Sequence, residues 1–123
     1  ASFIGAPHIN LIPARFENKK LVCGNLKLSG FKNLPEDIEL VLGIRPDFLR
    51  PDTKGQLEIQ VDLVEQHGAD NLVYGALKNS SNDTELCFKT TQNTLPDIDS
   101  NLKLKFEQKH AMVFNKSTGE RLI

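Results

Sequence analysis

QLEIQVDLVEQHGADNLVYGAL, residues 56–77, is the stretch around which the rest of the chain is organised. Its first half alternates apolar with polar residues: Leu57, Ile59, Val61 and Leu63 against Glu58, Gln60 and Asp62. Successive side chains of a strand point to opposite sides of a sheet, so the alternation predicts a strand with one buried face. Residues 67–71 then favour a turn, since Gly68 accepts a positive φ and Asp70 and Asn71 hydrogen-bond their own backbone. Leu72, Val73, Tyr74 and Leu77 resume a strand, which completes a predicted β-hairpin.

Strand signals recur on both sides of this hairpin. Further strands are predicted at residues 8–16, 19–23, 26–31, 38–45, 85–90, 101–107, 112–114 and 121–123. The residues predicted to face inward along them are Ile38, Leu40, Leu42, Ile44, Leu86, Phe88, Leu102, Leu104 and Phe106. Pro13 predicts an edge strand or a bulge, because proline cannot donate to a sheet. Short helical turns are expected near residues 47–49 or 108–111.

No segment keeps a helical period, and turn signals recur every ~8–12 residues, a spacing typical of all-β sandwiches and barrels. The predicted fold is therefore all-β: an OB-like small barrel or a β-sandwich of short antiparallel strands. Gly30, Gly43 and Gly75 lie within or beside the strand patterns and predict bulges or sharp bends.

Length and charge narrow the functional classes. The 123 residues predict one domain over residues 1–123. Fifteen basic against 16 acidic residues give a net charge of −1, which argues against a nucleic-acid partner. No apolar run approaches the ~20 residues that cross a bilayer, and no signal peptide is visible, so we expect a soluble chain.

The chain carries no local signature of catalysis. It has no phosphate loop, no GxGxxG and no GxSxG. His8, His67 and His110 are scattered without a second ligand at metal spacing, so no catalytic, metal or cofactor residue is predicted. Cys23 and Cys87 are expected to be reduced, half-buried thiols, although a disulfide between them stays open on sequence grounds.

Four ordered segments carry a resemblance to a known family. They are FIGAPHINLIPA at 3–14 (family FIGSPxMNxLxA), LGIRPDFL at 42–49 (LGIRPEHL), VEQHGADNLVY at 64–74 (VExLGxxxLVY), and residues 106–122, which end in VFNKSTGERL (LFDxETGERL). The chain resembles the C-terminal regulatory, transport-associated OB (TOBE) domain of ATP-binding subunits of bacterial ABC importers. The maltose and sn-glycerol-3-phosphate importer type is the most similar. The chain departs from the family at Ala6 (Ser), at Asp47 and Phe48 (Glu-His), and at Met112 (His).

This resemblance implies a fragment that does not hydrolyse ATP. ATP and Mg would belong to a nucleotide-binding domain preceding residue 1, with the lead-in ASFIG as the point of entry. The implied role is regulation and homodimerisation of the ATP-binding subunit. The implied partners are its own nucleotide-binding domain, a second copy, membrane permease subunits, and a regulatory protein or small effector. The implied location is the cytoplasmic face of the membrane. The candidate interface residues are Ile44, Arg45, Pro46, Gly68, Ala69, Asp70, Asn71 and Phe114.

Two other functions remain open. A stand-alone β-barrel module could bind a small oxyanion, because related β-barrel domains bind molybdate; calorimetry against molybdate, phosphate and glycerol-3-phosphate tests this. An OB-fold nucleic-acid binder is disfavoured by the near-zero net charge, and salt-dependent binding to single strands would revive it.

Overall fold

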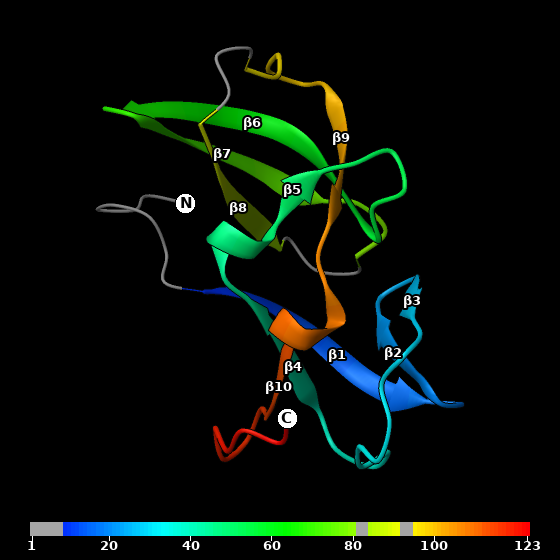
Figure 1. Cartoon of the computed structure of the whole chain (residues 1–123). Coiled ribbons are helices and arrows are strands. Elements are labelled where there is room, and N and C mark those ends of the chain that lie inside the picture. The colour runs from blue at the N-terminus through cyan, green and yellow to red at the C-terminus, as the bar shows by residue number, and fades with distance from the viewer. Residues whose placement is uncertain (1–8, 81–83, 92–94) are drawn as a thin grey trace.

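The fold consists of two five-stranded antiparallel sheets (Figure 1). The computed structural model describes residues 9–80, 84–91 and 95–123; the expected lead-in at 1–7, His8, and parts of the expected loops at 79–83 and 94–100 lie outside these ranges. Sheet 1 has the order β10-β4-β1-β2-β3, with β1 Asn10–Glu17, β2 Lys20–Cys23, β3 Leu26–Leu28, β4 Leu40–Ile44 and β10 Met112–Asn115. Sheet 2 has the order β5-β9-β6-β7-β8, with β5 Arg50–Pro51, β6 Leu57–His67, β7 Asp70–Leu77, β8 Glu85–Thr90 and β9 Asn101–Lys105. The all-β, OB-like prediction is confirmed.

Two single-turn 3-10 helices carry the chain between the sheets. The first, η1 (Pro46–Phe48), leads from β4 to β5, and the second, η2 (Gln108–His110), leads from β9 back to β10. The Phe48 ring stacks on the His110 ring with centroids 3.7 Å apart, so the two crossings pack against each other. Both helical turns agree with the sequence prediction. Within the described ranges, no helix is long and apolar enough to cross a membrane.

The main hydrophobic core is shared by both sheets, and a smaller cluster of Leu72, Tyr74 and Cys87 lies apart from it. Alternate residues of each long strand point into the main core, as the period of two requires. Among the predicted inward positions, the fully buried ones are Leu40, Leu42, Ile44, Leu57, Ile59, Val61, Leu86, Phe88, Leu104 and Phe106. Ile38 and Leu102 pack against this core while remaining partly exposed.

Leu63 is the exception, because β6 contains a β-bulge. Val61 pairs with Gly75, but the next pair along the ladder is Leu63 with Tyr74, which leaves Asp62 as the extra residue. One extra residue reverses the side to which every later side chain points. Leu63 is consequently 42% exposed, and Val64 packs against the core instead. The prediction that Leu63 faces inward is therefore wrong. The bulge expected at Gly75 lies in β6 instead, opposite Gly75.

The central hairpin turns more tightly than predicted. The ladder continues to the His67–Asp70 pair and leaves only Gly68 and Ala69 in the turn. Gly68 has φ +62°, as the first central residue of a type II′ turn requires. The predicted turn at Gly24 and Asn25 is confirmed, since Cys23 pairs with Leu26.

Pro13 lies within a central strand, whereas the sequence predicted an edge strand or a bulge. β1 pairs with β4 over residues 10–14 and with β2 only over residues 15–17. Pro13 therefore lies where β1 pairs with β4 alone. The other side of the strand is unpaired there, so a residue without an N–H is tolerated.

Candidate functional site

The eight candidate interface residues lie in three separate places. The first is the corner where β4 enters η1. Ile44 is fully buried in the core and Pro46 is buried as the first residue of η1, so the exposed Arg45 alone presents its side chain at this corner. The Arg45 carbonyl accepts a hydrogen bond from the Phe48 N–H at 3.0 Å, which closes the helical turn.

The second place is the tip of the β6–β7 hairpin. Gly68 and Ala69 are exposed, and Asp70 and Asn71 are half-buried. No atom lies within 4 Å of the position that a Gly68 Cβ would occupy, so the tip projects freely. β8 lies between this tip and the first place, because β8 pairs with β7 and its Lys89 bonds to Asp47 of η1 at 3.3 Å. Residues 44–46 and residues 68–71 therefore do not form one continuous surface.

Phe114 belongs to the third place, the face of sheet 1 that points away from the core. Two rows of paired residues cross this face: Leu11–Gly43–Met112 and Pro13–Val41–Phe114. We call the five side chains Leu11, Pro13, Val41, Met112 and Phe114 the outer face of sheet 1. A Cβ on Gly43 would meet Phe114 Cε2 at 2.9 Å, so the phenyl ring lies across the glycine.

The outer face of sheet 1 is entirely apolar and partly open. Leu11 is 53% exposed, and the other four side chains are half-buried. Charged groups lie at its border: Glu39 approaches Arg15 at 3.7 Å and Lys116 at 3.9 Å. An apolar centre with a charged border is the usual anatomy of a protein–protein interface.

Phe114 was a candidate from the sequence, whereas Leu11, Pro13, Val41 and Met112, which share its face, were not. The sequence of β4 (LVLGI) did indicate this face, because the residues on both sides of the strand are apolar. Leu40, Leu42 and Ile44 already fill the core, so Val41 and Gly43 must face elsewhere. Apolar residues on the second side of a strand indicate a sheet covered on both sides.

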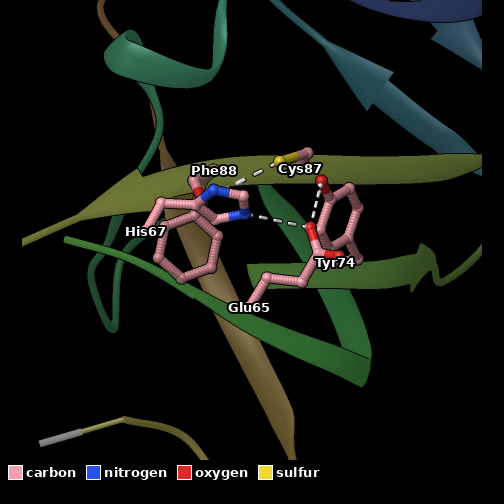
Figure 2. Close-up of polar contacts among 5 residues, drawn as sticks. All are labelled: Glu65, His67, Tyr74, Cys87 and Phe88. Atoms are coloured by element: carbon pink, nitrogen blue, oxygen red, sulfur yellow. Dashed lines mark hydrogen bonds and ion pairs between the residues drawn. The ribbon is translucent and has the colours of Figure 1, made fainter. Parts of the chain in front are cut away.

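A polar cluster lies on the side of sheet 2 that faces away from the core (Figure 2). The Tyr74 hydroxyl donates to Glu65 Oε1 at 3.0 Å, and His67 Nε2 lies 3.4 Å from the same oxygen. Burial and the hydrogen bond to Glu65 raise the pKa of the Tyr74 hydroxyl. Glu65 thereby links His67, near the tip of the hairpin, to the buried Tyr74.

Both cysteines are free and buried. Cys23 belongs to β2 in sheet 1 and Cys87 to β8 in sheet 2, and both are more deeply buried than expected. Burial raises the pKa of Cys23 to about 12. Burial raises the pKa of Cys87 to about 11, although a hydrogen bond with Tyr74 lowers it in part. Neither thiol is therefore an activated nucleophile at neutral pH.

The acidic groups do not form a metal centre in the described part of the chain, where no group of three or more His, Cys, Asp or Glu side chains converges. Asp62, placed by the bulge, lies beside Glu85 at the start of β8. Burial, and then the charge of Asp62, raise the pKa of Glu85.

Comparisons with known proteins agree with this architecture. The TOBE domain family model matches residues 42–114. The chain is 45% identical, over 99% of its length, to the sn-glycerol-3-phosphate import ATP-binding protein UgpC of Roseobacter denitrificans, of which it covers 35%. It is 31% identical to UgpC of Psychromonas ingrahamii and 30% identical to UgpC of Escherichia coli, covering 34% and 35% of them.

The chain spans about a third of the length of these curated relatives. The family model covers more than half of the chain, from the end of β4 through most of β10, and thus includes all of sheet 2. The motif at 42–49, the central hairpin and Phe114 all lie inside the match. This chain therefore belongs to the TOBE domain family.

Proposed function

We propose that this chain is the regulatory domain of the ATP-binding subunit of a bacterial ABC importer for sn-glycerol-3-phosphate or a sugar. The observation that carries the proposal is the similarity to UgpC proteins along 99% of the chain. In this assignment, ATP and Mg bind in a separate nucleotide-binding domain. The domain described here performs no catalysis, in keeping with a sequence that has no phosphate-loop motif.

The location and the other partners follow from the same proposal. An importer's ATP-binding subunit works at the cytoplasmic face of the membrane, against permease subunits. We infer that this domain contacts its own nucleotide-binding domain and a second copy of the subunit. A regulatory protein or small effector is a further partner of such a domain.

We propose that the second copy is bound by the outer face of sheet 1. Its five apolar side chains are the interface centre, and the Arg15–Glu39–Lys116 group is the charged border. A homodimer is most simply built about a two-fold axis, with the same patch on each copy. Because the patch is small and only Leu11 is more than half exposed, the isolated domain should associate weakly.

Sedimentation velocity over a range of concentrations tests this surface. The wild-type chain should show a reversible monomer–dimer equilibrium, and Phe114→Lys should weaken it by roughly tenfold or more, as burying an unpaired charge predicts. Leu11→Lys, at the most exposed position of the patch, should do the same without disturbing the core. Ile98→Lys, at an exposed apolar residue beside sheet 2, is the matched control and should associate like wild type. A strictly monomeric wild-type chain, or lysine variants that still dimerise, would refute the proposed surface.

A further inference from the structure

The outer part of β6 has a strand neighbour on one side only. β9 pairs with β6 over residues 57–60, whereas β7 pairs with β6 as far as His67. Hydrogen bonds between Val61 and the segment 99–100 end the contact on the β9 side. Figure 1 shows the β6–β7 hairpin projecting beyond β9 toward its free tip. Beyond the bulge, β6 is thus an open edge among the residues that the structure describes.

The alternation of the ladder shows which backbone groups face outward. In a hairpin with a two-residue turn, the closing pair exchanges hydrogen bonds, and bonded pairs alternate with non-bonded ones. His67–Asp70 is the closing pair, so Glu65–Leu72 is bonded and Val64 and Gln66 belong to non-bonded pairs. The N–H and C=O of Val64 and Gln66 therefore point to the open side. Neither residue's main chain bonds to a described residue there.

Two other edges are covered in the part of the chain that the structure describes. The outer edge of β8 is bonded by the Asn10 carboxamide, which joins both main-chain groups of Cys87 at 2.8 Å. The outer edge of β10 is bonded by the C-terminal segment, with the Leu122 N–H donating to the Val113 carbonyl at 2.7 Å. Folded proteins usually cover or blunt such edges, so an open one is a site for pairing with another chain.

A groove with a largely aliphatic lining runs beside the open edge. It is lined by Leu63, Val64 and Gln66 from β6 and by Leu95, Pro96, Asp97 and Ile98 from the segment before β9. Leu63 is 42% exposed and Ile98 is 53% exposed, and they are among the most exposed large apolar side chains described. The segment is held in place by the Ser100 N–H, which donates to the Asp97 carbonyl at 3.1 Å, and by the Asp99 N–H, which donates to Val61.

The charges around the groove have one sign. Asp97 lines it, Asp99 follows in the same segment, and both are exposed. Neither residues 55–77 nor residues 91–102 contain a lysine or arginine. The complementary ligand therefore carries positive charge. A second copy of β6 would bring carboxylates against carboxylates, which destabilises cross-strand pairing.

We propose that the β6 edge from Leu63 to His67 binds an extended, lysine- or arginine-containing segment of a partner protein as an added β-strand. The main chain of the partner pairs with Val64 and Gln66. Its apolar side chains lie against Leu63 and Ile98, and its basic side chains lie beside Asp97 and Asp99. Strand addition of this kind takes affinity from the main chain and specificity from alternate side chains. The site is on sheet 2, away from the outer face of sheet 1, and does not depend on the transporter assignment.

The probe is a synthetic peptide of about nine alternating lysine and valine residues, within the usual length of a strand. Titrated into the ¹⁵N-labelled chain, it should shift the amide resonances of Val64 and Gln66 and slow their hydrogen exchange. A peptide with glutamate in place of lysine should bind at least roughly tenfold more weakly, because of charge repulsion. The lysine peptide methylated on its backbone nitrogens should lose binding as well, because it cannot donate to the strand.

A pair of variants isolates the backbone contribution. Gln66→Pro removes the outward N–H without removing a ladder bond, and should weaken binding of the lysine peptide by roughly tenfold. Gln66→Ala retains the N–H and should bind within about twofold of wild type. Equal binding of the methylated peptide, shifts that map away from β6, or shifts at Val64 and Gln66 caused by self-association of the chain alone would each overturn the proposal. The methylated peptide supplies the same information if Gln66→Pro does not fold.

Discussion

Asn10 and Cys87 are 77 positions apart in the chain, and the Asn10 carboxamide bonds both main-chain groups of Cys87. Asn10 Nδ2 donates to the Cys87 carbonyl, and the Cys87 N–H donates to Asn10 Oδ1, each at 2.8 Å. The carboxamide has the same donor and acceptor as a peptide group, so it takes the place of one residue of an additional strand beside β8. This buried pair joins sheet 1 to sheet 2.

Removing the Asn10 carboxamide should destabilise the fold substantially. Asn10→Ala leaves a buried N–H and a buried carbonyl without partners, so we expect a loss of about 2–4 kcal/mol in the free energy of unfolding. Asn10→Asp keeps the acceptor but loses the donor and adds a charge, so it should not rescue stability at neutral pH. Urea denaturation measures both. Gln60→Ala is the control, because the Gln60 amide makes only an exposed bond of 3.4 Å, and it should change stability by less than about 0.5 kcal/mol. Equal stability of Asn10→Ala and wild type would contradict this role.

Gly75 and Gly68 should respond differently to alanine. A Cβ at Gly75 would lie 2.6 Å from the Gln60 carbonyl oxygen and 2.9 Å from Ile59 Cδ1, beside the bulge of β6. Backbone cannot move aside easily, so we expect Gly75→Ala to cost about 2–3 kcal/mol. At Gly68 the space is open and only its φ of +62° opposes a side chain, so Gly68→Ala should cost about 1 kcal/mol. Thermal unfolding measures the loss of stability in both variants. A larger loss in Gly68→Ala than in Gly75→Ala would refute the account of the bulge.

Glu85 should make stability depend on pH in the acidic range. Its pKa is raised in the folded chain by burial and by Asp62. Protonated Glu85 therefore stabilises the folded chain. This contribution is complete below the pKa of an unfolded glutamate, ~4.3, and is lost as the pH rises through the pKa of Glu85 in the folded chain. At pH 7 the two carboxylates repel, so Glu85→Gln should stabilise the chain by about 0.5 kcal/mol. Near pH 4 the gain should vanish. The same gain at both pH values would mean that the repulsion does not operate.

The thiols of Cys23 and Cys87 should be unreactive in the folded chain. With the pKa of Cys87 raised to about 11 and that of Cys23 to about 12, thiolate is scarce at pH 8. A chromogenic disulfide reagent should therefore react with neither cysteine in the native state and with both in urea. These raised values also predict that stability is retained up to about pH 9 and declines as the pH rises through the folded values. Rapid labelling of the native chain at pH 8 would contradict the described burial.

The strands and the core could be predicted from sequence because period-two patterns report burial directly. Leu57, Ile59 and Val61 are buried as their alternation requires. Leu63 continues the same pattern and yet is exposed, because a bulge depends on how two strands meet across the ladder. Pro13 was predicted in an edge strand or a bulge; it lies in a central strand, but at a position with one neighbour, because β2 begins pairing only at Arg15.

The candidate surfaces were harder to predict than the fold. The motif that resembles the family drew attention to Ile44, which is core, and to Arg45, which is exposed. The outer face of sheet 1 required the strand order, since Leu11, Val41 and Phe114 come from three strands distant in sequence. The open edge of β6 likewise depends on where β9 stops pairing. Both are properties of topology, which local patterns do not contain.

Transport by a chimeric subunit tests the proposed function most directly. This chain would replace the matching C-terminal third of UgpC from Escherichia coli, and uptake of labelled sn-glycerol-3-phosphate would be measured in cells that lack their own UgpC. Our account predicts that the chimera restores uptake, that Phe114→Lys impairs it, and that Lys54→Ala, at an exposed residue of the turn before β6, leaves it unchanged. A correctly folded, normally abundant chimera that restores no uptake would contradict the assignment of this chain as an importer's regulatory domain.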